Sequence, residues 1–204
     1  VKVFNWVATM YKGSIYVKTP LLFALAFIFQ LLIGGLTGVV IGALATDVHL
    51  HDTYFVVGHL HYVMFGGAGF AFFGALHYWF GKIYGRMYNE SIAQMAFGLM
   101  FAGFNILYFP MLILGIMGMP RRYYDYLPEF TGLNVASTVG SWILILGMII
   151  MIINLVRSRK KGEIAPRDPW GGTTLEWQTA SPPTLHNFDV EPVIPEEGPY
   201  YHGN

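Results

Sequence analysis

Residues 53–81 read TYFVVGHLHYVMFGGAGFAFFGALHYWFG, a run of 29 residues without Asp, Glu, Lys or Arg. About 20 apolar residues in an α-helix cross the ~30 Å hydrocarbon core of a bilayer, so this run can span a membrane with some tilt. Three further charge-free runs, at residues 19–46, 91–120 and 130–156, are 28, 30 and 27 residues long. The sequence therefore predicts four complete transmembrane helices in an all-α, polytopic bundle.

The composition of the whole chain agrees with a membrane protein. Of its 204 residues 54% are hydrophobic and only 12% are charged, and 12 basic side chains balance 12 acidic ones. Soluble domains typically carry roughly 25% charged residues, so the composition argues strongly against a soluble enzyme. Zero net charge argues against a nucleic-acid partner, which requires a basic face. A sequence without cysteine has no disulfide and no thiolate metal site.

The chain divides into a transmembrane region, residues 1–161, and a tail, residues 162–204. The first ten residues read like the last turns of a fifth helix cut in its middle, so we expect a fragment of a longer membrane protein. The tail holds seven of the eleven prolines and seven of the twelve acids, which predicts an irregular run along the inner surface. Within it, residues 174–177 (TLEW) and 181–183 (SPP) indicate either a strip that docks on neighbouring protein or a solvated tail.

Cationic side chains mark one end of the predicted bundle. An antiparallel path of four helices places eight of them together, namely Lys12, Lys18, Lys82, Arg86, Arg157, Arg159, Lys160 and Lys161. The positive-inside rule assigns that end to the cytoplasm, or to the matrix in a mitochondrion. Arg121 and Arg122 are expected at the opposite end, where an anionic ligand is one reason for a pair of arginines.

Histidines are concentrated around the second span, whose charge-free run contains His59, His61 and His77. Two of them, His59 and His61, lie close together within the apolar segment of residues 54–64. An ionisable residue at membrane depth indicates a functional site. Helix positions i and i+2 point about 200° apart, so the two rings cannot share one metal ion while the helix stays regular. Because neutral imidazole is a common iron ligand, the spacing favours two cofactors flanking one helix. Two unrelated interhelical hydrogen bonds are the alternative.

Just before this span lie Asp47, His51 and Asp52. Adjacent His and Asp side chains at a membrane edge can share a hard divalent ion, with waters supplying further oxygen ligands. Polar residues also gather at helix ends without binding a metal, so the spacing alone leaves both interpretations open.

Several segments resemble subunit I of the haem-copper terminal oxidases, in order along essentially the whole chain. The most specific is residues 51–63 (HDTYFVVGHLHYV), which closely resembles the tenth-helix signature of that family. The others are residues 1–6 (VKVFNW), 34–38 (GGLTG), 118–123 (GMPRRY), 175–177 (LEW) and 182–183 (PP). The resemblance implies the C-terminal part of subunit I, from late in helix eight through helix twelve of its twelve-helix fold.

The resemblance also implies roles for the polar residues of the second span and its border. His59 would be the axial ligand of the high-spin haem at the oxygen-reducing centre, and His61 one of two axial ligands of the low-spin haem. His51 and Asp52 match the ligands of a non-redox magnesium ion that is shared with subunit II. Asp47 matches a carboxylate near the propionates of the high-spin haem.

Three cationic residues receive roles in the same way. Arg121 and Arg122 match an arginine pair that binds haem propionates, and guanidinium forks suit carboxylates. Lys2 matches the lysine of the K proton pathway, and a lysine at membrane depth can titrate. The alternative for Lys2 is a lysine at a helix end whose ammonium reaches the membrane surface.

The activity implied is that of a proton-pumping cytochrome c oxidase of a respiratory chain, which reduces dioxygen to water. Its cofactors would be two haems of the A type, copper and magnesium. Its partners would be subunits II and III, cytochrome c acting through subunit II, and the lipid bilayer of a bacterial plasma membrane or mitochondrial inner membrane. The tail would lie on the cytoplasmic or matrix side. The copper ligands belong to earlier helices, so the fragment alone is not expected to be active.

Two other classes of membrane protein are alternatives to an oxidase, and the sequence argues against both. A bis-histidine b-type cytochrome of a quinol-oxidising complex places paired ligands about four turns apart on one face of a helix, unlike His59 and His61. A proton or metal transporter would carry acidic partners inside the spans, and the four runs contain none. The run of residues 51–54 (HDTY) also fits cytochrome c-using oxidases better than quinol-using ones, which tend to replace the Asp.

Overall fold

The computed structural model describes residues 1–188 and 192, and within them the regular structure is helical. Four helices are long and apolar enough to cross a membrane: Thr19–Gly42, Tyr54–Tyr84, Glu90–Ile116 and Pro128–Lys161. In order along the chain the elements are α1 (Lys2–Met10), α2 (Thr19–Gly42), α3 (Leu44–Leu50), α4 (Tyr54–His61), the π-helix η1 (Tyr62–Gly69), α5 (Phe70–Tyr84), α6 (Glu90–Ile116), the short η2 (Pro128–Phe130), α7 (Thr131–Lys161) and η3 (Leu175–Gln178). The predicted all-α bundle with four spans is confirmed.

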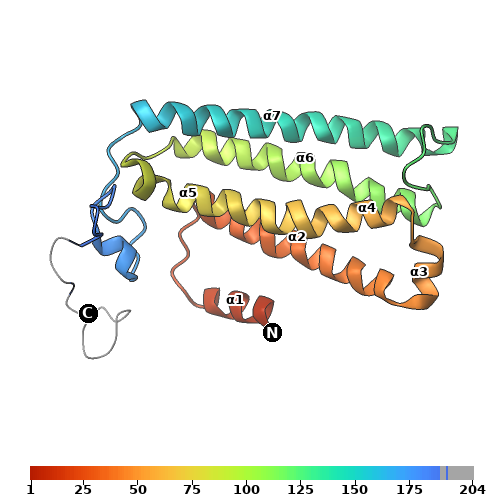
Figure 1. Cartoon of the computed structure of the whole chain (residues 1–204), viewed down its shortest axis with the longest axis horizontal. Coiled ribbons are helices and arrows are strands. Elements are labelled where there is room, and N and C mark those ends of the chain that lie inside the picture. The colour runs from red at the N-terminus through yellow and green to blue at the C-terminus, as the bar shows by residue number, and fades with distance from the viewer. Residues whose placement is uncertain (189–191, 193–204) are drawn as a thin grey trace.

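The four long helices run antiparallel and side by side (Figure 1). At one end the start of α2 meets the start of α6, where the Thr19 N–H donates to Glu90 Oε1 over 2.7 Å. At the same end the Met87 N–H, after α5, donates to the carbonyl of Glu163, after α7, over 2.8 Å. At the other end the Tyr54 N–H, at the start of α4, donates to the Met119 carbonyl over 3.0 Å. The path therefore separates Lys18, Lys82 and Arg86 from Arg121, as predicted; which end faces the cytoplasm stays a prediction.

Three of the predicted span ends differ from the helices by four or five residues, for local reasons. The first helix ends at Gly42 instead of residue 46, because Ala43 is extended and the chain turns into the short helix α3. The third ends at Ile116 instead of residue 120. There Gly118 has a φ of +89°, and the Met119 and Gly118 N–H groups bond back to the carbonyls of Leu114 and Gly115 in a Schellman motif. The last helix continues to Lys161, since its final turn carries cations that favour a helix C-terminus.

Glycine brings α6 and α7 into close contact. A Cβ at Gly103 would lie 2.4 Å from the backbone nitrogen of Leu144, and one at Gly140 would lie 2.5 Å from that of Leu107. Small residues at such crossings let helix backbones approach closely in a membrane, where van der Waals packing drives association. The contact holds α6 against α7 and leaves the opposite side of α6 for α4 (Figure 1).

The first part of the tail folds back onto the end of α5. Trp177 is only 2% exposed, and its indole N–H donates to the Tyr78 hydroxyl over 3.1 Å. The Trp170 indole N–H donates to the Tyr78 carbonyl over 2.8 Å, and the two rings stack with their centroids 5.8 Å apart. For this segment either docking on neighbouring protein or a solvated tail was expected, and Trp177 packs against its own chain. In the described part of the tail the one helical turn is η3, and an irregular run along the inner surface stays a prediction.

Candidate functional site

The helix that carries the predicted ligands begins at a defined cap. Thr53 precedes the first turn of α4, and its hydroxyl accepts a hydrogen bond from the Phe55 N–H over 3.2 Å. Such a cap satisfies one of the free N–H groups at a helix N-terminus. It fixes the start of α4 and therefore the directions in which His59 and His61 point.

His59 faces α2. Its Nδ1 lies 3.0 Å from the Gly34 carbonyl and 3.1 Å from the Thr37 hydroxyl. A carbonyl only accepts, so Nδ1 carries the proton and Nε2 keeps its lone pair. A Cβ at Gly38 would lie 3.0 Å from the Cε1 of this ring, so the glycine leaves the room that the imidazole occupies.

His61 faces α6. Its Nδ1 donates to the Val57 carbonyl, one turn earlier in its own helix, over 2.8 Å. Its ring stacks on that of Tyr108, with the centroids 4.2 Å apart and the planes 15° from parallel. As in His59, the proton on Nδ1 leaves Nε2 as the ring atom that can bind a metal.

The two imidazoles thus diverge as the i, i+2 spacing predicts, one toward α2 and the other toward α6. The alternative of two unrelated interhelical hydrogen bonds does not describe His61, whose bond stays within α4. In both residues a backbone carbonyl fixes the tautomer, which is the usual outer-shell arrangement of a metal-binding histidine. The chemistry of the site therefore fits two separate metal-centred groups, one on each side of the helix.

A π-helix follows His61 directly, and the sequence pattern did not predict it. η1 runs from Tyr62 to Gly69, and Tyr62 is fully buried with its hydroxyl donating to Asn105 Oδ1 over 2.9 Å. π-helical turns inside long helices are frequent at functional sites. A possible signal in the sequence is the glycine-rich run of residues 65–69 (FGGAG), because glycine tolerates altered backbone packing.

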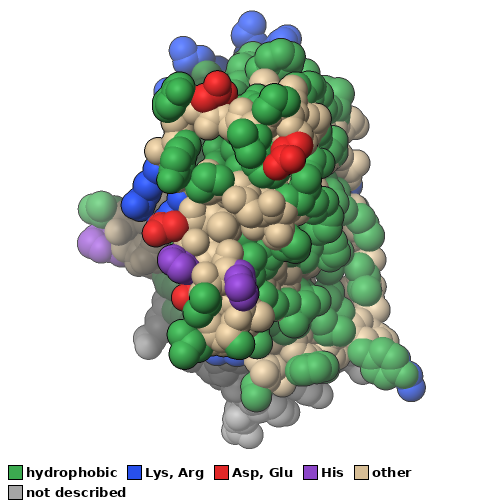
Figure 2. Space-filling view, turned by 90° about the vertical axis from the view of Figure 1, so that its right-hand side faces the viewer, with side chains coloured by type: hydrophobic (Ala, Val, Ile, Leu, Met, Phe, Trp, Pro, Cys, Tyr) green, Lys and Arg blue, Asp and Glu red, His purple; other side chains and the backbone are tan. Residues whose placement is uncertain are grey.

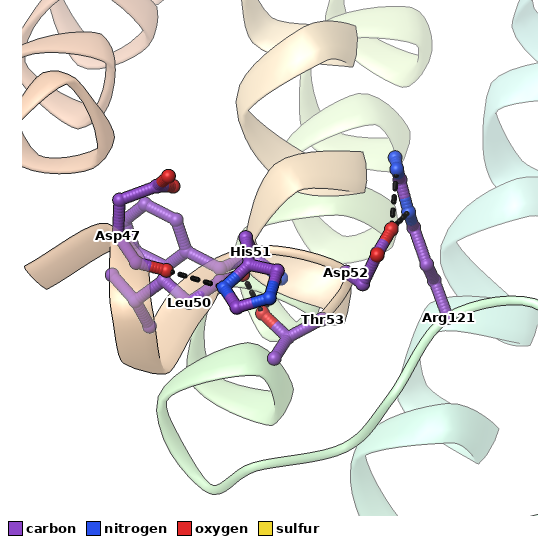
Figure 3. Close-up of polar contacts among 7 residues, drawn as sticks. Asp47, Leu50, His51, Asp52, Thr53 and Arg121 are labelled. Carbon is purple, nitrogen blue, oxygen red and sulfur yellow. Dashed lines mark hydrogen bonds and ion pairs between the residues drawn. The ribbon is translucent and has the colours of Figure 1, made fainter. Parts of the chain in front are cut away.

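At the end of the bundle that carries α3, charged side chains gather beside two histidines (Figure 2). Arg121 binds Asp52 through two nitrogens, with Nε 2.8 Å and Nη2 2.6 Å from Oδ1 (Figure 3). The backbone supports the pair, because the Arg121 N–H donates to the Asp52 carbonyl over 2.8 Å. The Arg121 guanidinium holds the pKa of the exposed Asp52 carboxyl below its ordinary value. Sequence reasoning placed both residues at this end but did not foresee that they pair.

The other residues predicted at this end lie close by. The Nδ1 of His51 donates to the Asp47 carbonyl over 2.8 Å, while the Asp47 carboxylate points away from that ring (Figure 3). Arg122 is exposed and has a φ of +69°. Within residues 1–188 and 192, no three His, Asp or Glu side chains gather closely enough to hold an ion. The Asp52 carboxylate is bound to Arg121 instead, and the magnesium role of His51 and Asp52 stays a prediction.

Lys2 lies apart from the two histidines of α4. It is exposed on α1, a helix without buried residues that reaches the bundle through Trp6, whose ring centroid is 5.4 Å from that of Phe27. The described part of the chain shows no hydrogen bond or ion pair from its ammonium group. The structure thus does not bring Lys2 together with the other predicted site residues.

Two polar groups of the opposite end were given no binding or catalytic role by the sequence, although Lys82 was counted among the cations of that end. His77 is fully buried, with Nδ1 donating to the Phe73 carbonyl over 2.7 Å and its ring stacked on Phe23. Lys82 is 7% exposed, and its ammonium donates to the carbonyls of Arg167, Thr179 and Ala180 in the tail. No pattern in the sequence indicates this contact, because the carbonyls that Lys82 binds lie 85 to 98 residues further along the chain.

The sequence of this chain matches a known protein family and several known proteins. Residues 1–157 match the family described as "Cytochrome C and Quinol oxidase polypeptide I". The chain is similar to cytochrome c oxidase subunit 1 of Synechocystis sp., with 49% identity over 203 residues, 100% of this chain and 37% of the relative. It is also similar to the subunit 1 of Thermostichus vulcanus, with 43% identity over the same shares of the two chains. The subunit 1 of Bacillus sp. is 46% identical over 95% of this chain and 32% of the relative.

A solved structure shares the fold. A chain of a haem-copper terminal oxidase dimer determined by cryo-EM superposes with a TM-score of 0.65 and 24% identity, over 72% of this chain and 27% of that one. The chain spans about a third of the length of the curated relatives it matches.

Proposed function

The chain belongs to the cytochrome c and quinol oxidase polypeptide I family, and on this premise we propose that it forms part of the catalytic subunit of a respiratory terminal oxidase. The oxidase would reduce dioxygen to water with electrons from cytochrome c and pump protons. Its four apolar helices and its family make it a multi-pass membrane protein. The observation that carries the proposal is the pair of imidazoles on α4, which point to different helices with Nε2 available in each.

We assign His59 to a high-spin haem and His61 to a low-spin haem, both of the A type. The haems supply the electron transfer and the reduction of dioxygen. The protein holds each imidazole by its Nδ1–H, and in the neutral ring Nε2 would be the atom that binds the iron. A neutral ligand also avoids the cost of a buried charge inside the bilayer.

Arg121, Arg122 and Asp47 would lie near the haem propionates. A guanidinium can bind a carboxylate with two parallel hydrogen bonds. In this structure Arg121 binds the Asp52 carboxylate, with Nε and Nη2 both on Oδ1, which supports a preference of this side chain for carboxylates.

His51 and Asp52 would hold magnesium together with ligands from subunit II. Carboxylate oxygen and water suit a hard divalent ion at a surface, and His51 would add one imidazole nitrogen to the Asp52 carboxylate. Copper would bind to histidines outside residues 1–204. The remaining partners are subunit III and the bilayer, with the cationic end of the bundle on the cytoplasmic or matrix side. The fragment alone would be inactive.

Lys2 would carry protons of the K pathway. Its exposure on α1 is compatible with a lysine that other helices of a longer polypeptide surround. The bis-histidine cytochrome of a quinol-oxidising complex, the strongest alternative, requires ligands on one face of a helix. The divergent rings of His59 and His61 favour the oxidase.

The test is the substitution His61→Ala in the oxidase polypeptide that contains this sequence. We expect the reduced-minus-oxidised spectrum to lose the low-spin haem while the carbon monoxide-reactive haem remains. His49→Ala, an exposed histidine of α3, is the matched control and should leave both haems in place. A His61→Ala spectrum identical to the unsubstituted one would refute the assignment, and a protein without any carbon monoxide-reactive haem would refute the oxidase itself.

A further inference from the structure

The imidazole of His61 is held by more than its hydrogen bond. The Tyr108 ring lies almost parallel to it, with the centroids 4.2 Å apart and an angle of 15° between the planes. The hydrogen bond from Nδ1 to the Val57 carbonyl fixes one direction in the ring plane. Rotation of the plane about that direction is left to whatever packs against the face of the ring, and that is Tyr108.

Tyr108 is itself held in place by aromatic neighbours. Its ring centroid lies 4.9 Å from that of Phe104, which is fully buried. Phe104 in turn makes an edge contact with Tyr62, the residue that follows His61, at 5.1 Å. Tyr108 is partly buried against this cluster, and these ring contacts limit its freedom to tilt.

Two contacts between α4 and α6 bracket the stacked pair along the helices. On one side Asn105, three residues before Tyr108, accepts a hydrogen bond from the Tyr62 hydroxyl over 2.9 Å. On the other side a Cβ at Gly58 would lie 2.7 Å from Leu112 Cδ2, which shows that the helices touch there. The spacing between α4 and α6 is therefore set on both sides of the His61–Tyr108 contact.

The arrangement is specific to one of the two histidines. His59 is oriented by two polar partners, the Gly34 carbonyl and the Thr37 hydroxyl, and in the described part of the chain no aromatic ring stacks on it. The difference matters because outer-shell groups orient metal ligands and tune the metal. In a haem with two imidazole ligands, the orientation of the ligand planes sets the splitting of the iron d orbitals.

We propose that Tyr108 is a positioning residue that sets the plane of the His61 imidazole for haem ligation. The inference rests on the proposed function, in which His61 ligates the low-spin haem. The flat face of the ring performs this role, and the phenol hydroxyl takes no part in it. Tyr108→Phe keeps the ring and should behave as the unsubstituted protein, whereas Tyr108→Leu removes the flat face.

The test uses electron paramagnetic resonance of the oxidised, haem-loaded oxidase that contains this sequence. For Tyr108→Leu we expect shifted g values and broader lines of the low-spin haem, together with roughly tenfold faster loss of that haem to an external acceptor. Tyr108→Phe and the control Phe109→Leu, an exposed neighbour on the same helix, should keep the g values and the line widths. Tyr108→Met, with a flexible side chain that fills the gap, replaces Tyr108→Leu if the latter does not assemble.

Unchanged g values and line widths in Tyr108→Leu, or in Tyr108→Met, would overturn the inference. An equal change in Tyr108→Phe would overturn it as well, because the hydroxyl would then be the active group. His61→Ala separates this result from a failure of the proposed function. If the low-spin signal survives His61→Ala, the haem assignment itself is wrong; if His61→Ala abolishes the signal while Tyr108→Leu leaves it unaltered, only the role of Tyr108 is wrong.

Discussion

Lys82→Met is expected to detach the tail from the end of α5. The Lys82 ammonium donates to the carbonyls of Arg167 and Thr179 over 2.9 and 3.0 Å, and to that of Ala180 over a longer 3.4 Å. It also lies 5.3 Å from the centroid of the Trp177 ring. Methionine retains the apolar stem of lysine but offers no hydrogen-bond donor. As long as the tail stays attached, these carbonyls would therefore lack the partner that Lys82 provides.

The size of the effect follows from these contacts. Hydrogen bonds to a charged group contribute about 1.5–3 kcal/mol each, and the longest of the three contributes least. Water hydrates the carbonyls when the tail detaches, and this offsets part of the energy of the three hydrogen bonds. We therefore expect the free energy that favours the attached tail over the detached tail to fall by about 3 kcal/mol. A change of 1.4 kcal/mol changes an equilibrium constant about tenfold, so the equilibrium constant for opening of the tail should rise about 100-fold.

Amide hydrogen exchange measures this opening directly. The Ala165 N–H, bonded to the Gly85 carbonyl, and the Trp177 N–H, bonded to that of Thr174, are protected only while the tail is folded. Peptides that contain them should exchange about 100-fold faster in Lys82→Met, and peptides of α6 and α7 should keep their rates. Lys160→Met removes an exposed lysine and is the control. Tail exchange in Lys82→Met that matches this control would refute the reasoning, because the indoles of Trp170 and Trp177 would then hold the tail without the ammonium.

Two further predictions concern glycines. Gly140→Ala should lower the stability of the purified protein by about 1–3 kcal/mol, because the new Cβ would lie 2.5 Å from the Leu107 nitrogen. The control is Gly132→Ala, where a Cβ meets nothing within 4 Å, and equal thermal unfolding transitions for the two variants would contradict the prediction. Gly38→Ala should shift the spectrum of the carbon monoxide complex, because its Cβ would lie 3.0 Å from His59 Cε1. Gly35→Ala, with no neighbour within 4 Å of its Cβ, is the control. Identical spectra for the two variants would argue against His59 as the ligand of the carbon monoxide-reactive haem.

Local patterns in the sequence predicted the helical spans and indicated which residues are the candidate ligands. Charge-free runs of 27–30 residues located the four spans. Two helices end before their runs do, at Gly42 and Ile116, where the chain turns, and the last helix continues past its run to Lys161. The spacing of His59 and His61 predicted that their rings diverge, since the geometry of one helix decides that. The π-helix after His61 was not foreseen, because the residues of η1 also fit an ordinary apolar α-helix.

What the sequence by itself determined is therefore what depends on neighbours along the chain: length and hydropathy for the spans, and helical phase for the two imidazoles. Only the tertiary structure decided which groups those side chains meet. Asp52 and Arg121 pair across 69 residues of sequence, Lys82 binds Thr179 across 97, and Tyr108 reaches His61 from another helix. These contacts depend on how helices cross and where backbones approach. Packing against residues far away in the sequence sets both, and the periodicity of a single helix contains no information about them.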